Sequence, residues 1–137
     1  LKQKKGSIIN ISSASAGPPL SKAFAYSVAK AGIKNLTMNL AREWAMNNVR
    51  VNAISAGPIR TLAASGIGDF RYILKWNELN APLKRNVTIE DVGGAGLYLL
   101  SDLGAGVTGE VHHVDCGYNV IGMKAVDAPD IEAVVKK

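Results

Sequence analysis

The sequence has a single cysteine and no long run of apolar residues. With Cys116 alone among its 137 residues, the chain cannot form an internal disulfide, and nothing points to an oxidising compartment. Its apolar stretches are far shorter than the roughly 20 residues that a helix needs to cross a bilayer. These absences predict a cytoplasmic protein without a membrane span.

Positive charge exceeds negative charge, but it is scattered. Sixteen Lys and Arg residues against eleven Asp and Glu residues give a net charge of +5. Basic residues cluster only at the two ends, within 2–5 and 136–137, and no aromatic residues alternate with them as in proteins that bind single-stranded nucleic acid. No nucleic-acid partner is expected, because phosphate groups on a cofactor or carrier account for the surplus equally well.

Hydrophobic patterning predicts a strand, a long helix and a second strand in the first part of the chain. The isoleucine-rich run 6–11 is too short for a stable helix and predicts a buried strand. Residues 23–47 carry apolar side chains at spacings of three and four, which predicts a helix. Residues 49–54 alternate as a strand before the breaker at 56–58. The expected apolar face of the helix consists of Ala29, Ile33, Leu36, Leu40 and Trp44.

The second part predicts a lid, a helix, a third strand and a tail. Residues 61–86 mix small residues with a short helical pattern over 69–79, and we interpret them as a mobile lid. Thr88-Ile-Glu-Asp91 is a capping-box pattern that predicts the start of another helix. Residues 109–115 predict a strand, and 123–137 a carboxyl-terminal surface arm.

Alternating strands and helices indicate an α/β fold with a parallel sheet. Residues 1–122 are expected to form one domain. Since functional sites in such sheets lie beyond the carboxyl ends of the strands, Ser12-Ser13, residues 57–59 and Cys116-Gly117 should converge on one crevice.

The predicted long helix carries a tyrosine and a lysine that suit proton transfer. Tyr26 and Lys30 are four residues apart, hence on one helical face, where an ammonium stabilises the phenolate form of a neighbouring phenol. Ser13 stands at the end of the preceding strand, where its hydroxyl could hold a substrate oxygen while Tyr26 protonates it. An ordinary amphipathic edge is the alternative for the Tyr/Lys pair alone. The added serine favours carbonyl or enolate chemistry that needs no metal.

Three segments resemble the short-chain dehydrogenase/reductase family. Ile-Ile-Asn-Ile-Ser-Ser (8–13), Tyr26-Ser-Val-Ala-Lys30 and Val-Arg-Val-Asn-Ala-Ile (49–54) look like its catalytic serine strand, its Tyr-x-x-x-Lys helix and the next strand. The resemblance implies the carboxyl-terminal part of a doubly wound, Rossmann-type sheet, and a nicotinamide cofactor, NAD or NADP. It implies Ser13 as the substrate-orienting hydroxyl, Tyr26 as the proton donor and Lys30 as the residue that holds the nicotinamide ribose. Gly57, Pro58, Ile59 and Thr61 are the further implied cofactor residues.

The second half is similar to bacterial enoyl-acyl-carrier-protein reductases in particular, through residues 55–67 and 109–115. This likeness favours NADH and implies an acyl thioester substrate on an acyl carrier protein, a lid closing over the acyl chain, and a homo-oligomer. The implied substrate-pocket residues are Ala63, Ile67 and Phe70. In that subfamily, however, the tyrosine and lysine stand seven residues apart, and residues 1–48 instead resemble a carbonyl reductase. A hybrid chain is therefore one hypothesis.

Three functions remain open at this stage. Reduction of an enoyl thioester is the first, and reduction of a ketone or oxidation of an alcohol, such as a 3-oxoacyl thioester, is the second. The third is an inactive oligomerising remnant, because the family's Gly-x-x-x-Gly-x-Gly turn, which seats the cofactor pyrophosphate, does not occur in the sequence. The initial Leu1 also suggests a fragment.

Neither the histidines nor the cysteine predicts a further site. His112 and His113 are adjacent in a predicted strand and point to opposite faces, so no metal site is expected. Cys116 is expected to be a small packed thiol.

Overall fold

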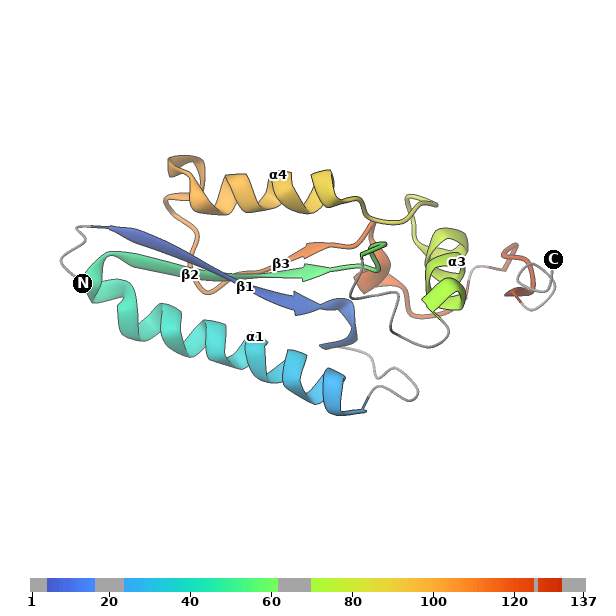
Figure 1. Cartoon of the computed structure of the whole chain (residues 1–137), viewed down its shortest axis with the longest axis horizontal. Helices are drawn as coiled ribbons and strands as arrows, with labels where there is room; N and C mark the ends of the chain where they lie inside the picture. The colour runs from blue at the N-terminus through green and yellow to red at the C-terminus, as the bar shows by residue number, and fades with distance from the viewer. Residues whose placement is uncertain (1–4, 17–23, 62–69, 125, 132–137) are drawn as a thin grey trace.

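A computed structural model describes residues 5–16, 24–61, 70–124 and 126–131 (Figure 1). Its strands are β1 (Gly6–Ser13), β2 (Val49–Ala56) and β3 (Val111–Val114), and its α-helices are α1 (Phe24–Trp44), α3 (Phe70–Asn80) and α4 (Ile89–Leu100). Short 3-10 turns follow several of them: η1 (Ala14–Ala16), η2 (Ala45–Asn47), η3 (Asp102–Gly104) and η4 (Tyr118–Val120).

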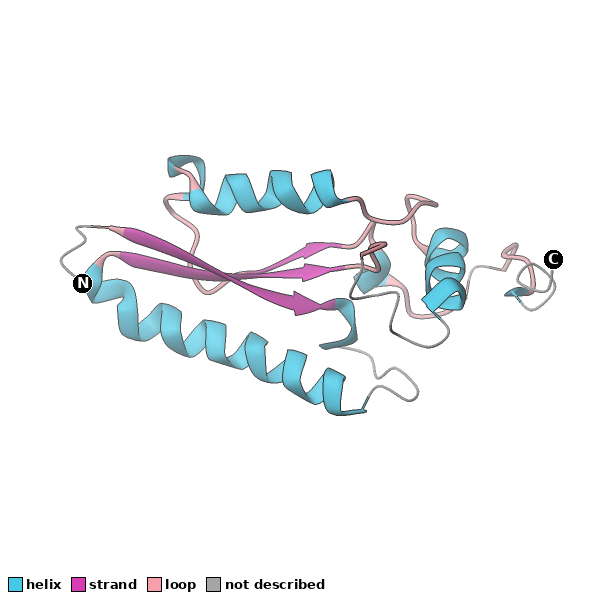
Figure 2. Cartoon of the chain, viewed as in Figure 1, coloured by secondary structure: helices cyan, strands magenta, loops and turns pink. Residues whose placement is uncertain are grey.

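The strands form one parallel sheet in the order β1-β2-β3. Helix α1 lies on one face of the sheet and α4 on the other, so the sheet is the middle layer of three (Figures 1 and 2). Gly6 pairs with Val49, and Ala53 pairs with Val111, so each pairing joins segments separated by a helix. This arrangement confirms the predicted α/β class and the predicted parallel sheet.

The central strand β2 is buried along most of its length, because helices cover both of its faces. Its one buried side-chain amide, Asn52, is partnered at both polar atoms: the Nδ2 donates to the Val107 carbonyl at 2.9 Å, and the Oδ1 accepts from the Glu110 N–H at 3.0 Å. These bonds fasten the segment that leads into β3. The alternating sequence pattern of this strand predicts one buried face, whereas consecutive residues of β2 are buried in the structure.

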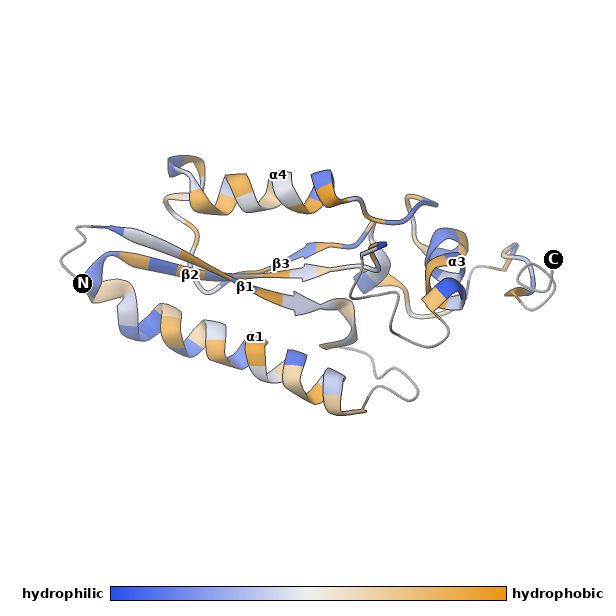
Figure 3. Ribbon diagram, viewed as in Figure 1, coloured by the Kyte–Doolittle hydropathy of each residue, from blue (hydrophilic) through white to orange (hydrophobic). Residues whose placement is uncertain are grey.

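Helix α1 runs where the sequence predicts it, but its buried face differs from the predicted one. Ala29 is exposed and Leu36 is 49% exposed, whereas Thr37 and Ala41 are the buried residues. Ile33, Leu40 and Trp44 are partly buried, as expected. The predicted face was built from apolar residues only. In the structure the polar residue Thr37 faces the sheet, where it accepts a hydrogen bond from Asn10 on β1. In Figure 3, apolar and hydrophilic segments alternate along α1.

Helix α4 is capped at both ends. The Thr88 Oγ1 accepts from the Asp91 N–H at 3.1 Å, and the Asp91 carboxylate accepts from the Thr88 N–H at 3.0 Å, which confirms the predicted capping box. At the other end, the guanidinium of Arg50 on β2 donates to the carbonyls of Leu99 (2.7 Å), Ser101 (3.1 Å) and Val107 (3.2 Å). The hydroxyl of Ser7 on β1 also donates to the Leu99 carbonyl at 3.1 Å, so two strands of the sheet hold the carboxyl end of α4.

The segment after Gly122 is mostly exposed in its described part, but Ile131 is buried. The boundary at residue 122 between a domain and an arm stays a prediction. Among the described residues, no helix combines the length and the apolar character that crossing a bilayer requires.

Candidate active site at the carboxyl edge of the sheet

The three strands end side by side, which brings the predicted site residues to one edge. Ser13 is opposite Ala56, and Ala56 is opposite Val114. The Gly57 N–H donates to the Val114 carbonyl at 2.9 Å, so residues 57–59 leave the sheet directly beside β3. The predicted meeting of the strand ends is confirmed.

Ser13 is held by the 3-10 turn that follows it. Its Oγ accepts from the Ser15 N–H at 3.3 Å and lies 3.0 Å from the Ser15 Oγ, and Ser15 is buried. A hydroxyl has one O–H donor besides its lone pairs. If both contacts to Ser15 use lone pairs of Ser13, the proton of Ser13 is left to donate to a substrate oxygen.

Tyr26 and Lys30 share one face in the first turns of α1. The Lys30 Nζ lies 5.6 Å from the centroid of the Tyr26 ring and donates to the Ile11 carbonyl at 2.8 Å. Tyr26 is 46% exposed. The ammonium thus joins the phenol ring to the end of β1, two residues before Ser13.

The segment after β2 is closely packed at its first position. A Cβ on Gly57 would stand 3.0 Å from the Asp115 Cα and 3.0 Å from the Val87 Cγ2, so a side chain there would require these neighbours to shift. Ile59 packs against the small core cluster of Ala81, Val87 and Cys116, and Thr61 is exposed. Residues 57–59 are therefore fixed by packing at the edge where a cofactor is expected.

Asp115 organises the turn after β3 and was not singled out from the sequence. Its buried carboxylate accepts from the Gly117 N–H at 3.0 Å, the Asn119 N–H at 2.9 Å and the Asn119 Nδ2 at 3.1 Å. An aspartate two residues before a glycine is a turn signal that could have revealed it. Cys116 is buried beside it in a small apolar cluster, which confirms the expected packed thiol, and burial raises the pKa of that thiol.

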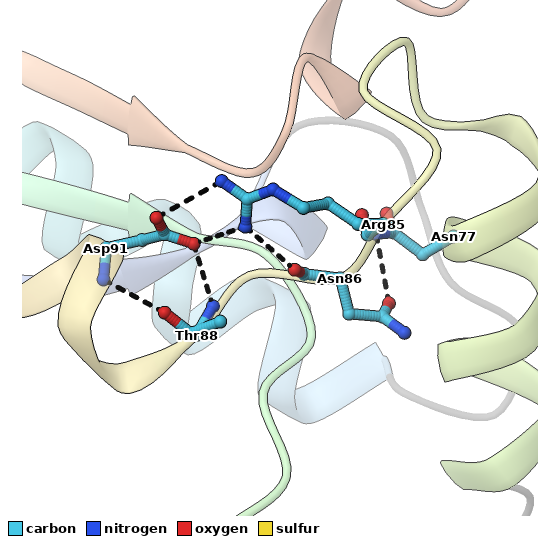
Figure 4. A network of polar contacts seen from close by, with 5 residues as sticks. All are labelled: Asn77, Arg85, Asn86, Thr88 and Asp91. Carbon is cyan, nitrogen blue, oxygen red and sulfur yellow. Dashed lines mark hydrogen bonds and ion pairs between the residues drawn. The ribbon is translucent and has the colours of Figure 1, made fainter.

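A polar network joins the carboxyl end of α3 to the start of α4 (Figure 4). The Asn77 Nδ2 donates to the Asn86 Oδ1 at 3.2 Å, and Arg85 forms a two-pronged ion pair with Asp91. The hydrogen bond from Arg85 lowers the pKa of Asp91 to about 2. The network anchors α3, whose first residue is the half-buried Phe70. The other two implied pocket residues, Ala63 and Ile67, lie outside the described residues.

A hollow of about 540 Å³ lies between β3, α4 and the segment before α4. His112 and His113 line it together with Tyr98, whose ring lies 6.4 Å from that of His112. Cys116 and Gly117, which follow β3 at the carboxyl edge, also line it, but none of the implied catalytic residues does. Within the described ranges, no group of three His, Cys, Asp or Glu side chains could hold a metal ion.

Comparison with known proteins assigns the chain to one group. The family model described as enoyl-(acyl carrier protein) reductase matches residues 1–119, which spans both the part resembling a carbonyl reductase and the part resembling an enoyl reductase. The enoyl-acyl-carrier-protein reductase (NADH) 1 of Rhizobium meliloti is 69% identical over 107 residues, covering 78% of this chain. The corresponding Rickettsia bellii protein is 49% identical over 121 residues, covering 88% of this chain.

Solved structures agree with the fold. The reductase of Anaplasma phagocytophilum in complex with NAD superposes with a TM-score of 0.85 at 51% identity and covers 93% of this chain. The chain spans 39% and 46% of the lengths of the Rhizobium and Rickettsia relatives, and 46% of the Anaplasma structure.

Proposed function

Because the chain belongs to the enoyl-(acyl carrier protein) reductase family, we propose that its residues serve the reduction of an enoyl thioester with NADH. The observation that carries the proposal is the position of Lys30, which contacts both the Tyr26 ring and the strand that ends in Ser13. This places a phenol, an ammonium and a hydroxyl beside one sheet edge. Such a set suits a reaction in which negative charge develops on a substrate oxygen.

The residues present fit the nicotinamide ribose end of the cofactor. The Lys30 ammonium has three donors, of which the Ile11 carbonyl takes one, and the Ser27 Oγ is buried without a hydrogen-bond partner among the described residues. Lys30 would hold the ribose hydroxyls, and Gly57, Pro58, Ile59 and Thr61 would line the nicotinamide. When bound, the cofactor supplies a hydride. The names of the Rhizobium and Rickettsia relatives support NADH.

The proposed proton transfer depends on Tyr26 and Ser13. The O–H of Ser13 donates a hydrogen bond to the thioester oxygen, and the phenol of Tyr26 gives its proton to that oxygen when it becomes an enolate. Lys30 keeps a positive charge beside the phenol. General acid catalysis of this kind contributes about 10² to 10⁴ in rate.

Family membership also leads us to propose a substrate, partners and a location for this protein. We propose an acyl thioester on an acyl carrier protein, with Ala63, Ile67 and Phe70 in the acyl pocket. We also propose a homo-oligomer and a cytoplasmic location. The names of the Rhizobium and Rickettsia relatives support the carrier-bound substrate.

Ketone reduction is a second candidate, favoured by one specific observation. Tyr26 and Lys30 are four residues apart and in contact, as in carbonyl-reducing relatives of the family. Assays with a crotonyl thioester and a 3-oxoacyl thioester on the same sample separate the two candidates.

Replacing Tyr26 with phenylalanine tests the proposed acid. Tyr26→Phe should lower kcat by about 10² or more while leaving the NADH dissociation constant within about twofold, because only the donated proton is removed. Tyr98→Phe, on the opposite face of the sheet, is the matched control and should behave as the unchanged protein. Unchanged turnover in Tyr26→Phe would exclude the acid role. A folded protein that binds no NADH would instead favour the inactive remnant.

Replacing Phe70 tests the acyl pocket. Phe70→Ala should change the preference between short and long acyl thioesters by about tenfold, since each buried methylene contributes about 0.8 kcal/mol to binding. The NADH dissociation constant should stay the same. An effect on NADH binding alone would remove Phe70 from the pocket.

A further inference from the structure

A row of polar contacts joins β1 to α1 behind the candidate active site. The Asn10 Nδ2 donates to the Thr37 Oγ1 at 2.9 Å, and the Thr37 hydroxyl donates to the Ile33 carbonyl at 2.8 Å. Thr37 is fully buried, although it is polar and central in the helix. The pair therefore lies inside the interface between sheet and helix.

The same interface holds Lys30 at both of its ends. The hydroxyl of Ser12, which is buried, donates to the Lys30 backbone carbonyl at 3.1 Å, and the Lys30 Nζ donates to the Ile11 carbonyl at 2.8 Å. We call Asn10, Ser12, Lys30 and Thr37 the polar seam. Asn10 and Ser12 lie on the strand, and each forms a hydrogen bond to one of the two helix residues, Thr37 and Lys30.

Such a seam fixes how far the helix is shifted along the strand. Apolar contacts are non-directional, so a helix packed only through them can shift along its axis with little change in buried area. Hydrogen bonds are directional, and a shift would leave the partly buried Asn10 amide and the buried hydroxyl of Thr37 without each other as partners. Because Ser13 ends the strand, the seam also fixes Tyr26 and Lys30 relative to Ser13.

We propose that Asn10 and Thr37 are positioning residues that set the register of α1 on β1 and thereby hold the Lys30 ammonium at the cofactor and substrate site. This inference rests on the proposed function for the identity of the ligand, NADH. Neither residue touches the ligand. Their effect passes through Lys30, which lies two helical turns before Thr37.

The test compares variants of the seam with a control on the same helix. Thr37→Val removes the hydroxyl with little change in shape, Thr37→Ser restores it, and Asn10→Ala removes the partner amide. Asn39→Ala is the control, since Asn39 lies on the exposed side of α1 and its amide donates to Asn35 of the same helix. Each protein is measured for its NADH dissociation constant by calorimetry, for the ¹⁵Nζ resonance and ammonium proton exchange of Lys30 by NMR, and for its melting temperature.

We expect Thr37→Val and Asn10→Ala each to weaken NADH binding by about tenfold and to speed ammonium proton exchange at Lys30. The double variant should bind NADH no more weakly than either single variant, because the two residues form one contact. Thr37→Ser and Asn39→Ala should bind as the unchanged protein.

Lower melting temperatures without a change at Lys30 or in NADH binding would show a merely structural pair and overturn the inference. Should Thr37→Val not fold, Asn10→Ala decides by the same readouts, because Asn10 is only partly buried. If the unchanged protein binds no NADH, the proposed function fails, and the Lys30 resonance still tests the seam.

Discussion

At the scale of single residues, Arg50 makes more long-range contacts than its place in a strand suggests. Its guanidinium donates hydrogen bonds to the carbonyls of Leu99, Ser101 and Val107, which lie at the end of α4 and in the segment before β3. Carbonyls at a helix end have no partner within the helix, and the dipole of the helix favours a cation there. Arg50 therefore joins α4 to the sheet.

Replacing Arg50 should reduce stability through these carbonyls. Arg50→Met should lower the free energy of unfolding by about 2 kcal/mol, as hydrogen bonds to a charged group are lost. Arg50→Lys should recover only part of this, because an ammonium cannot reach three carbonyls with the planar geometry of a guanidinium. Urea unfolding measures both. Equal stability of all three proteins would contradict the assignment.

Single-residue contacts were the least predictable part of the chain. Ser13, Tyr26 and Lys30 could be named from residue type and spacing, and the structure brings Lys30 against both the Tyr26 ring and the strand of Ser13. Thr37 could not, because a threonine among apolar helix positions carries no sign that its partner is an asparagine on another element. Such pairings depend on register between elements, which no local pattern contains.

At the scale of elements, the start of α4 depends on one carboxylate. The hydrogen bond from Arg85 lowers the pKa of Asp91 to about 2, whereas an unfolded aspartate has a pKa of about 3.9. The folded state therefore binds fewer protons at this group than the unfolded state between these values. The stabilisation by Asp91 is complete above about pH 4 and is lost as the pH falls toward 2.

Asp91→Asn should show this pH dependence in its melting temperature. The difference from the unchanged protein should be largest above about pH 4 and should shrink toward zero near pH 2, as the native carboxyl becomes protonated. Glu90→Gln, in the same helical turn, controls for the general effect of negative charge at a helix start. A difference that stays constant from pH 7 to pH 2 would contradict the role of the Arg85 ion pair.

The ends of helices and strands could be predicted from the sequence where nearby residues determine them. The capping box at Thr88 and Asp91 fixed the start of α4, and the left-handed Asn48, at φ 59°, lies between the end of the long helix and β2. The burial of elements was harder to predict. The exposed position of Leu36 follows from the layer that α1 packs on, which a periodic apolar pattern does not specify.

At the scale of the whole molecule, large apolar side chains are exposed on the two covering helices. Phe24 is 83% exposed at the start of α1, and Leu97 and Leu103 are 70% and 81% exposed on and just after α4. Exposed apolar groups of this size on a soluble protein favour association. The predicted homo-oligomer is consistent with these surfaces.

Association should depend on concentration and on the α4 surface. Light scattering of the purified chain should give a mass above that of one chain at micromolar concentration, and Leu97→Lys with Leu103→Lys should lower it. Met123→Lys replaces an exposed apolar residue outside both helices and should leave the mass unchanged. A single-chain mass at every concentration would contradict the prediction.

The parallel pairing of the strands also determines how the chain folds. Gly6 meets Val49, and Ala53 meets Val111, so no strand can pair with a neighbour through a hairpin. Each pairing closes a long loop that contains helical residues, and closing such loops slows folding relative to helical proteins of the same size. The apolar strands are unpaired until these loops close, so refolding yield should fall as protein concentration rises.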